Sequence, residues 1–155
     1  MESKAIYNLF KFIEDKKPQY KTPFKVKLVY DPNSLTKEDL NVKGDLNLRN
    51  TPIQSLPNGL EVGGYLDLRG TNIKELPNDL KVGDSLLLND TQIQSLPDGL
   101  VVGGRLNLSG TQIQRLPDDL KVGGYLYLED TPLSEKYTEE EIKAMVPGVK
   151  GNIYL

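Results

Sequence analysis

The chain has 155 residues, among them 19 basic and 22 acidic residues, and contains neither cysteine nor histidine. This length allows one domain with a core of its own. The composition excludes disulfides, thiolate nucleophiles, zinc ribbons and every catalytic triad that needs histidine or cysteine. The net charge of −3 gives no general attraction to nucleic acid. Because the sequence shows neither a signal peptide nor a run of ~20 apolar residues, we expect a cytoplasmic protein without a membrane partner.

The first 43 residues are predicted to form an N-terminal cap, and they are basic, with nine lysines against six acids. Residues 3–17 are expected to be a helix with Ile6, Leu9, Phe10 and Ile13 on one face, ended by Pro18. Residues 24–30 alternate between apolar and other side chains, which predicts a half-exposed strand. Residues 35–42 are similar to half of the repeat that follows them.

Residues 44–133 repeat with a period of 20, in four full copies and a fifth that diverges. Such a period indicates stacked structural units. Each copy contains a Leu-x-Leu pair, an alternation typical of a half-buried strand whose leucines point inward while the residue between them points outward. These pairs are Leu46/Leu48, Leu66/Leu68, Leu86/Leu88, Leu106/Leu108 and Leu126/Leu128.

After the strand, the apolar residues of the first copy are Ile53, Leu56, Leu60 and Val62, spaced for neither a helix nor a strand. We interpret them as corners of a chain that coils around a common axis. Proline after Leu56 excludes a long helix on this return leg, and the Gly-Gly pairs are assigned to the bend before the next strand. A threonine column is assigned to a buried ladder: Thr51, Thr71, Thr91, Thr111 and Thr131. A pentapeptide β-helix is the alternative, but it needs an apolar centre every five residues.

Residues 134–155 are predicted to form a C-terminal cap. Thr138–Glu141 is a capping box that opens a short helix with Ile142, Met145 and Val146 on its apolar side. Residues 152–155 repeat the strand pattern and are expected to add a last strand to the ladder. The whole chain, 1–155, is therefore interpreted as a single domain.

The segment Gly63–Ile73, GGYLDLRGTNI, resembles the leucine-rich repeat, whose consensus is L-x-x-L-x-L-x-x-N-x-L. Thr71 stands where the family usually has asparagine, and Gly63 stands at the first leucine. The 20-residue length and the Leu-Pro return leg look like the shortest bacterial class, found in secreted effectors and in phage and prophage proteins. The resemblance covers residues 40–133. It implies a β-rich (α/β) solenoid, a leucine-rich-repeat stack with a parallel strand ladder, capped at both ends by a helix and a strand.

The ending KYTEEEI…GNIYL is also similar to that of phage-type repeat proteins. This likeness implies a phage or prophage protein that acts in the host bacterial cytoplasm. Its partner would then be a bacterial protein of a defence or regulatory system, which it would modulate, for example as an inhibitor.

The outward positions of the strands are the candidate binding surface. Exposed tyrosine and arginine beside an outward leucine are typical of an interface hot spot, although tyrosine also suits any exposed strand. The candidate partner-binding residues are Leu87, Arg105, Asn107, Tyr125, Tyr127 and Tyr154. We therefore expect a non-enzymatic protein-binding module, a monomer rather than a homo-oligomer, with no catalytic residue, metal or cofactor.

Two other functions remain open at this stage. The lysines of the N-terminal cap could direct the protein to nucleic acid, or could simply protect a strand edge from aggregation; they are Lys16, Lys17, Lys21, Lys25 and Lys27. The chain could also be the recognition part of a bacterial ubiquitin-ligase effector, but the ligase activity itself would need a cysteine that the chain lacks.

Overall fold

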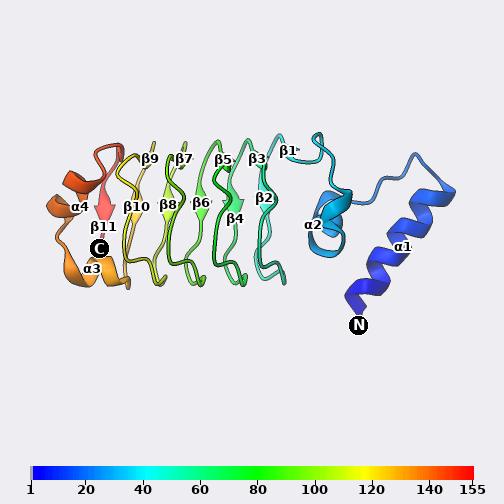
Figure 1. Ribbon diagram of the computed structural model, residues 1–155, viewed down its shortest axis with the longest axis horizontal. Coiled ribbons are helices and arrows are strands. Elements are labelled where there is room, and N and C mark those ends of the chain that lie inside the picture. Colours follow the sequence, from blue (N-terminus) through cyan, green and yellow to red (C-terminus); the bar gives the residue numbers. More distant parts are fainter. Residues whose placement is uncertain (1) are drawn as a thin grey trace.

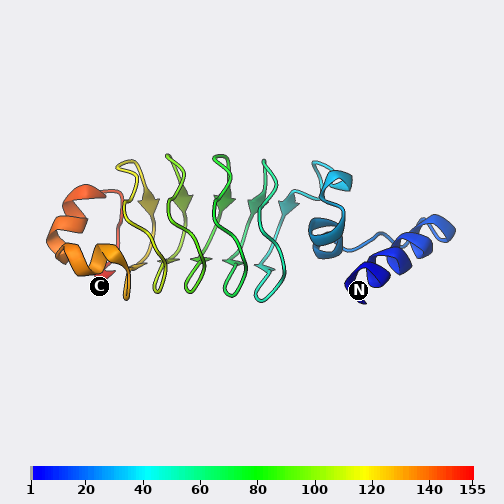
Figure 2. The same ribbon diagram turned by 60° about the horizontal axis from the view of Figure 1, so that its bottom comes forward.

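The computed structural model describes residues 2–155, with side chains from residue 4 onward. The chain forms a parallel β-solenoid that is flanked by helices at both ends (Figure 1). Its coils stack along one axis, and both ribbon views show the strands of successive coils side by side (Figures 1 and 2). The predicted fold class is confirmed.

Each coil contributes one short strand to each of two parallel sheets. The front sheet contains the Leu-x-Leu strands, in the order β11-β10-β8-β6-β4-β2. Its strands are β2 (Leu46–Asn47), β4 (Leu66–Asp67), β6 (Leu86–Leu87), β8 (Leu106–Asn107), β10 (Leu126–Tyr127) and β11 (Ile153–Tyr154). The back sheet lies on the return leg, in the order β1-β3-β5-β7-β9. Its strands are β1 (Asn41–Val42), β3 (Glu61–Val62), β5 (Lys81–Val82), β7 (Val101–Val102) and β9 (Lys121–Val122).

The core is the column of leucines, isoleucines and valines that the repeat keeps constant. Leu66, Leu68, Leu86 and Leu88 have no exposed surface. The buried apolar positions keep the uneven spacing of the sequence and do not recur every five residues, so the pentapeptide alternative is wrong. The threonine ladder is confirmed for four of its five members, since Thr71, Thr91, Thr111 and Thr131 are buried, whereas Thr51 in the first coil is half-buried. Each threonine hydroxyl donates a hydrogen bond to the carbonyl three residues earlier, which satisfies both groups.

The Gly-Gly pairs lie in the bend before each front strand, as predicted, but the first glycine is needed for a second reason. A Cβ atom at Gly63, Gly103 or Gly123, or at Gly83 in the matching Gly-Asp pair, would lie closer than 3.0 Å to the carbonyl oxygen of the preceding coil. Glycine is required here because neighbouring coils approach closely, and not because the backbone adopts a left-handed conformation. Lys43 occupies the same position one coil earlier, where its carbonyl is the group that Gly63 faces.

A second column does use the left-handed conformation. Asn50, Gly70, Asp90, Gly110 and Asp130 all have φ between 54° and 70°. Side chain and glycine alternate along this column because a Cβ at Gly70 or Gly110 would come within 3.0 Å of the Asn50 or Asp90 Oδ1 atom before it. The position after each front strand is therefore restricted to Asn, Asp and Gly, the residues that tolerate this conformation.

The N-terminal cap contains α1 (Glu2–Lys16), α2 (Phe24–Tyr30) and the 3₁₀ turn η1 (Pro32–Ser34). The helix predicted over residues 3–17 is confirmed, whereas the strand predicted over 24–30 is wrong. The segment has no strand partner, and it packs with helical spacing: Leu28 is buried, and Phe24 and Val29 lie against the core. The half repeat is confirmed, because Asn41 and Val42 of β1 pair with Glu61 and Val62 of β3.

The C-terminal cap contains α3 (Pro132–Lys136), α4 (Glu139–Met145) and β11. The predicted capping box of Thr138 and Glu141 opens α4, and β11 pairs with β10 as predicted. Two details differ from the sequence-based expectation. The helix α3, which Thr131 caps, was not anticipated, and Met145 is exposed and does not face the core. None of the helices within residues 2–155 has the length and apolar character needed to cross a lipid bilayer.

Candidate partner-binding face

The outward residues of the front sheet form a file that runs along the solenoid axis. Because the strands pair in parallel and in register, each outward residue lies beside the one 20 residues further on. Strands in a sheet lie ~4.8 Å apart, so the file brings residues from distant parts of the chain into one row. The file is Asn47, Asp67, Leu87, Asn107, Tyr127 and Tyr154. This is the register that the sequence predicts.

The C-terminal end of the file carries a cluster of three aromatic rings, Tyr125, Tyr127 and Tyr154, which we call the tyrosine patch. The rings of Tyr127 and Tyr154 are stacked, with centroids 4.8 Å apart and planes 15° apart. Tyr125 meets both rings edge to face, at 6.5 and 5.9 Å. Tyr125 is 47% and Tyr154 is 38% exposed. Such pairs gain ~0.5–1.5 kcal/mol beyond area burial, so the patch is a pre-packed aromatic surface.

Arg105 and Asn107, on the neighbouring strand, have different environments. Arg105 is exposed, and among the side chains of residues 4–155 it has no ion-pair partner. Its guanidinium is free to meet a carboxylate on another molecule. Asn107 is half-buried, and its Oδ1 accepts a hydrogen bond from the Ser109 backbone N–H at 3.0 Å. Asn107 therefore shapes the bend after its own strand.

Leu87 points outward as predicted, but it is only 8% exposed. It lies in a hollow of about 310 Å³. The hollow is also lined by Tyr65, Asp67, Arg69, Ser85 and Arg105. The longer side chains around Leu87 cover it, which a pattern of alternating letters cannot show. Leu87 therefore forms the floor of this hollow and has little exposed surface.

An ion pair closes the N-terminal side of this hollow. Asp67 is 2% exposed, and its carboxylate accepts bonds from the Arg69 Nε and NH2 groups at 2.9 and 2.6 Å. The Arg69 backbone N–H donates to the same carboxylate at 3.1 Å. Burial alone would raise the pKa of Asp67, but these hydrogen bonds and the charges of Arg69 and Arg49 outweigh it and lower that pKa. Asp67 therefore stays ionised beneath the face.

The sequence-based reasoning did not single out this Asp67–Arg69 pair. The signal was the Asp-x-Arg spacing, which places both side chains on the outer face of one strand end, because residues two apart share a face. The spacing is ambiguous by itself. An acid is needed as well, because Arg49 stands two residues after the uncharged Asn47, is exposed and has no ion-pair partner among the described side chains.

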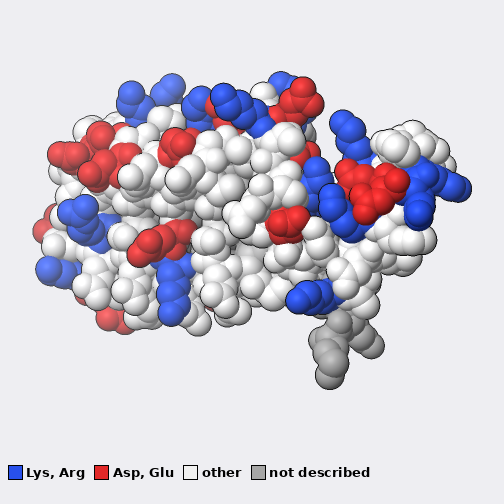
Figure 3. Space-filling model, turned by 45° about the vertical axis from the view of Figure 1, so that its right-hand side comes forward, with Lys and Arg blue, Asp and Glu red and all other residues white. Residues whose placement is uncertain are grey.

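The face offers exposed aromatic rings and a free guanidinium as groups for binding. Among the side chains of residues 4–155, no three His, Cys, Asp or Glu residues lie close enough together to hold a metal ion. One of the lysines of the N-terminal cap has an acidic partner, since Lys27 pairs with Asp39 at 3.2 Å. Figure 3 shows basic and acidic side chains side by side over this cap.

No protein family model matches the chain, and neither a curated protein nor a solved structure matches it. The assignment that stands on the structure itself is a parallel β-solenoid with a 20-residue repeat and capped ends.

Proposed function

We propose that the protein is a non-enzymatic binding module that recognises a protein partner through the outer face of the front sheet. The observation that carries this proposal is the tyrosine patch, in which three rings 4.8–6.5 Å apart remain partly exposed. Tyrosine and arginine are enriched at binding hot spots, and rigid aromatic side chains lose little conformational entropy on binding.

The dimensions of the surface support a protein partner. From Leu87 to Tyr154 the file crosses four strands, a distance of ~15 Å at the usual strand spacing. With Arg105 and Tyr125 beside it, this is the size of a hot-spot cluster within an interface of ~800 Å² per partner. The hollow over Leu87 adds a recess next to the patch, and Arg105 at its edge can pair with a carboxylate of the partner.

The resemblance to short leucine-rich repeats supports a narrower version of the proposal. In this version the protein comes from a phage or prophage, acts in the bacterial cytoplasm and modulates a defence or regulatory protein of the host. This step rests on the likeness of the repeat and of the C-terminal ending alone.

The experiment begins with a pull-down from bacterial lysate and identification of the partner by mass spectrometry. Binding of the purified partner is then measured by calorimetry for Tyr125→Ala combined with Tyr127→Ala. We expect this double variant to weaken binding by ~2 kcal/mol or more, with an unchanged fold by circular dichroism.

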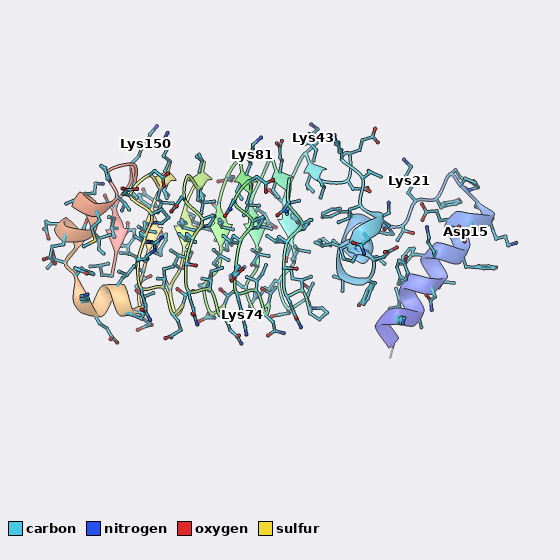
Figure 4. All side chains as sticks on the ribbon, viewed as in Figure 1. Asp15, Lys21, Lys43, Lys74, Lys81 and Lys150 are labelled. Atoms are coloured by element: carbon cyan, nitrogen blue, oxygen red, sulfur yellow. The ribbon has the colours of Figure 1, made fainter. Side chains whose placement is uncertain are left out.

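The matched control changes two lysines on the back sheet, Lys81→Ala with Lys121→Ala. Figure 4 shows Lys43, Lys81 and Lys150 pointing outward along one edge of the solenoid. Lys81 pairs there with Glu61 in an exposed contact, which contributes little to stability. The control should bind normally. If the control loses affinity and the tyrosine variant keeps it, the binding site lies on the back sheet and the proposal is wrong.

A further inference from the structure

Helix α1 has one face attached to the rest of the protein. The Tyr7 hydroxyl donates a hydrogen bond to the Asp31 carboxylate, and the Tyr7 ring lies 6.4 Å from the ring of Tyr30 on α2. Two turns further on, the Glu14 carboxylate accepts hydrogen bonds from Thr22. These contacts fix which side of α1 faces inward. Among the described side chains of α1, residues 4–16, none belongs to the hydrophobic core or packs against it.

A different face of α1 is apolar and uncovered. Ile6, Leu9 and Phe12 are 50%, 58% and 60% exposed, and Ile13 is half-buried beside them. At helical spacing these four residues form a stripe about 120° wide. An amphipathic helix normally buries such a stripe against another element. Figure 1 shows α1 at the end of the molecule, beyond α2.

The stripe has a basic end. Its C-terminal part opens into a hollow of about 460 Å³, where Phe12 and Ile13 lie with Lys16, Lys17 and Lys21. Two helices that paired in parallel through this stripe would bring both lysine clusters together and repel each other. An antiparallel pair would place the clusters at opposite ends and would also align the helix dipoles favourably.

We propose that α1 is a dimerisation element that pairs, antiparallel, with α1 of a second copy of the chain. The stripe is self-complementary about Leu9, as a two-fold interface requires. Ile6 lies three residues before Leu9, and Phe12 and Ile13 lie three and four residues after it. With the two-fold axis at Leu9, Leu9 faces its own copy, and Ile6 faces Phe12 and Ile13 of the other copy.

The interface is small, so the dimer is reversible. Each helix of 15 residues is ~22 Å long, and pairing two of them buries on the order of 1,000 Å² in total. That is below the ~1,200–2,000 Å² of stable specific interfaces and in the range of weak, transient ones. The prediction from sequence favoured a monomer, and the exposed stripe is the observation that points the other way.

Dimerisation through α1 would leave the front sheet free. The tyrosine patch lies at the opposite end of the solenoid from α1 (Figure 1). A dimer would therefore carry two separate copies of the patch and could bind a multimeric or clustered partner with increased avidity. The dimer does not depend on the function proposed for the patch, and each can be wrong without the other.

Sedimentation velocity on the full chain tests the proposal, over concentrations from about 1 µM to about 1 mM. We expect the average mass to rise from 17.3 kDa towards twice that value. Leu9→Gln combined with Phe12→Gln should remain monomeric, because glutamine keeps the helix but removes the apolar contact. The matched control, Asn8→Gln with Lys11→Gln, changes α1 outside the stripe and should dimerise like the wild type. A wild type that stays at 17.3 kDa throughout, or variants that all dimerise equally, would overturn the proposal.

Cross-linking tests the orientation, since the chain has no cysteine of its own. Leu9→Cys should form a disulfide-linked dimer on mild oxidation. Lys16→Cys should not, because two copies of this position would be ~21 Å apart in the antiparallel pair, beyond the reach of a disulfide. Efficient cross-linking at Lys16→Cys would rule out the antiparallel arrangement.

Co-sedimentation with phosphatidylserine-containing vesicles tests whether the stripe binds a lipid surface and not a second copy of the chain. Binding to them that the stripe variant loses would assign the stripe to a lipid surface and overturn the proposal.

Discussion

The two caps protect the ends of the solenoid in different ways. The C-terminal cap continues both sheets: β11 extends the front sheet, and Val149 forms a bridge with Val122 of the back sheet. Its Ile142 and Val146 have no exposed surface. The N-terminal cap continues only the back sheet, through β1, and buries one apolar side chain, Leu28.

The junctions show the same contrast. Between the N-terminal cap and the first coil lies a hollow of about 290 Å³, lined by Leu28 and Val29 on one side and by Ile53 and Leu56 on the other. A cap that adds strands to the sheets satisfies the backbone hydrogen-bonding groups of the last coil and also buries its apolar side chains. A helix laid against the end only covers it. We therefore expect the C-terminal cap to be required for folding and much of the N-terminal cap to be dispensable.

The largest effect should come from removing the C-terminal cap, with removal of α1 as the comparison. Truncation after Thr131 removes α3, α4 and β11 and exposes Leu126 and Leu128 to water. We expect aggregation or loss of cooperative unfolding, measured by size-exclusion chromatography and thermal denaturation. Deletion of residues 1–21 removes α1, in which none of the apolar side chains of residues 4–16 is buried, and should leave a cooperative transition at a similar temperature. A soluble and cooperatively folded truncation after Thr131 would contradict the assigned role of the C-terminal cap.

Single apolar substitutions refine the comparison. Leu86→Ala or Leu106→Ala in the middle of the stack should each cost ~2–5 kcal/mol, because each leucine is fully buried. Ile142→Ala in the C-terminal cap should fall in the same range, whereas Leu9→Ala in α1 should stay within ~0.5 kcal/mol. Urea unfolding measures all four.

Tyr127→Ala is the control for the direction of the strand faces, because Tyr127 points outward and is only half-buried. It should cost much less than Leu106→Ala. Equal losses would mean that the two faces of the front sheet have been assigned the wrong way round.

Two glycines, one near each end, test how closely the coils approach. A Cβ atom at Gly151 would lie 2.5 Å from the Gly124 carbonyl oxygen, whereas a Cβ at Gly44 would meet nothing within 4 Å. Gly151→Ala should therefore cost ~1–3 kcal/mol through overpacking. Gly44→Ala should be neutral or slightly stabilising, because alanine restricts the unfolded chain. Thermal denaturation distinguishes them, and equal melting temperatures would disprove the close approach of β11 to the last coil.

The smallest effect concerns acid and the N-terminal cap. The Asp39 carboxylate accepts hydrogen bonds from the Thr36 backbone N–H and hydroxyl and from Lys27. The Thr36 backbone bond is the largest cause of a pKa below the ordinary value for Asp39; burial opposes it, and Lys27 adds to it. A carboxylate with a lowered folded pKa stabilises the protein above its unfolded pKa, near ~3.9, and loses that contribution as the pH falls below it.

Asp39→Asn should therefore cost about 1 kcal/mol at pH 7, as the loss of a capping interaction does. The difference from the wild type should shrink as the pH falls below about 4. Denaturant unfolding at several pH values measures this dependence. A difference that stays constant down to pH ~3 would mean that the ionised carboxylate does not stabilise the cap.

The sequence predicts the repeat region better than the ends. The Leu-x-Leu pairs specify which face is buried and therefore the register of the front sheet, because every copy gives the same answer. The back sheet was not anticipated, although Leu80 and Val82 are buried and Lys81 between them is exposed, the same alternation as in the Leu-x-Leu pairs; these apolar residues were interpreted as corners. The segment 24–30 occurs once. Its alternation fits a strand, yet no neighbouring strand is available to pair with it, and it forms α2.

Prediction of the candidate site from the sequence is limited in the same way. The tyrosine rings come together because the front strands pair in the register that the sequence predicts, and the packing of the rings follows from that register. The cover over Leu87 and the Asp67–Arg69 pair depend on the conformations of long side chains from adjacent coils. The pattern of one coil does not contain that information.

The alternation along the left-handed column sets the unit in which such a chain can lengthen. Asn50, Gly70, Asp90, Gly110 and Asp130 repeat their pattern of side chain and glycine every 40 residues, although the fold repeats every 20. A duplication of 40 residues copies this pattern intact. A duplication of 20 places two side chains or two glycines in succession, and two side chains meet the clash that Gly70 avoids. In this column, growth without a clash therefore takes place by pairs of coils, or by copying a single coil that carries glycine.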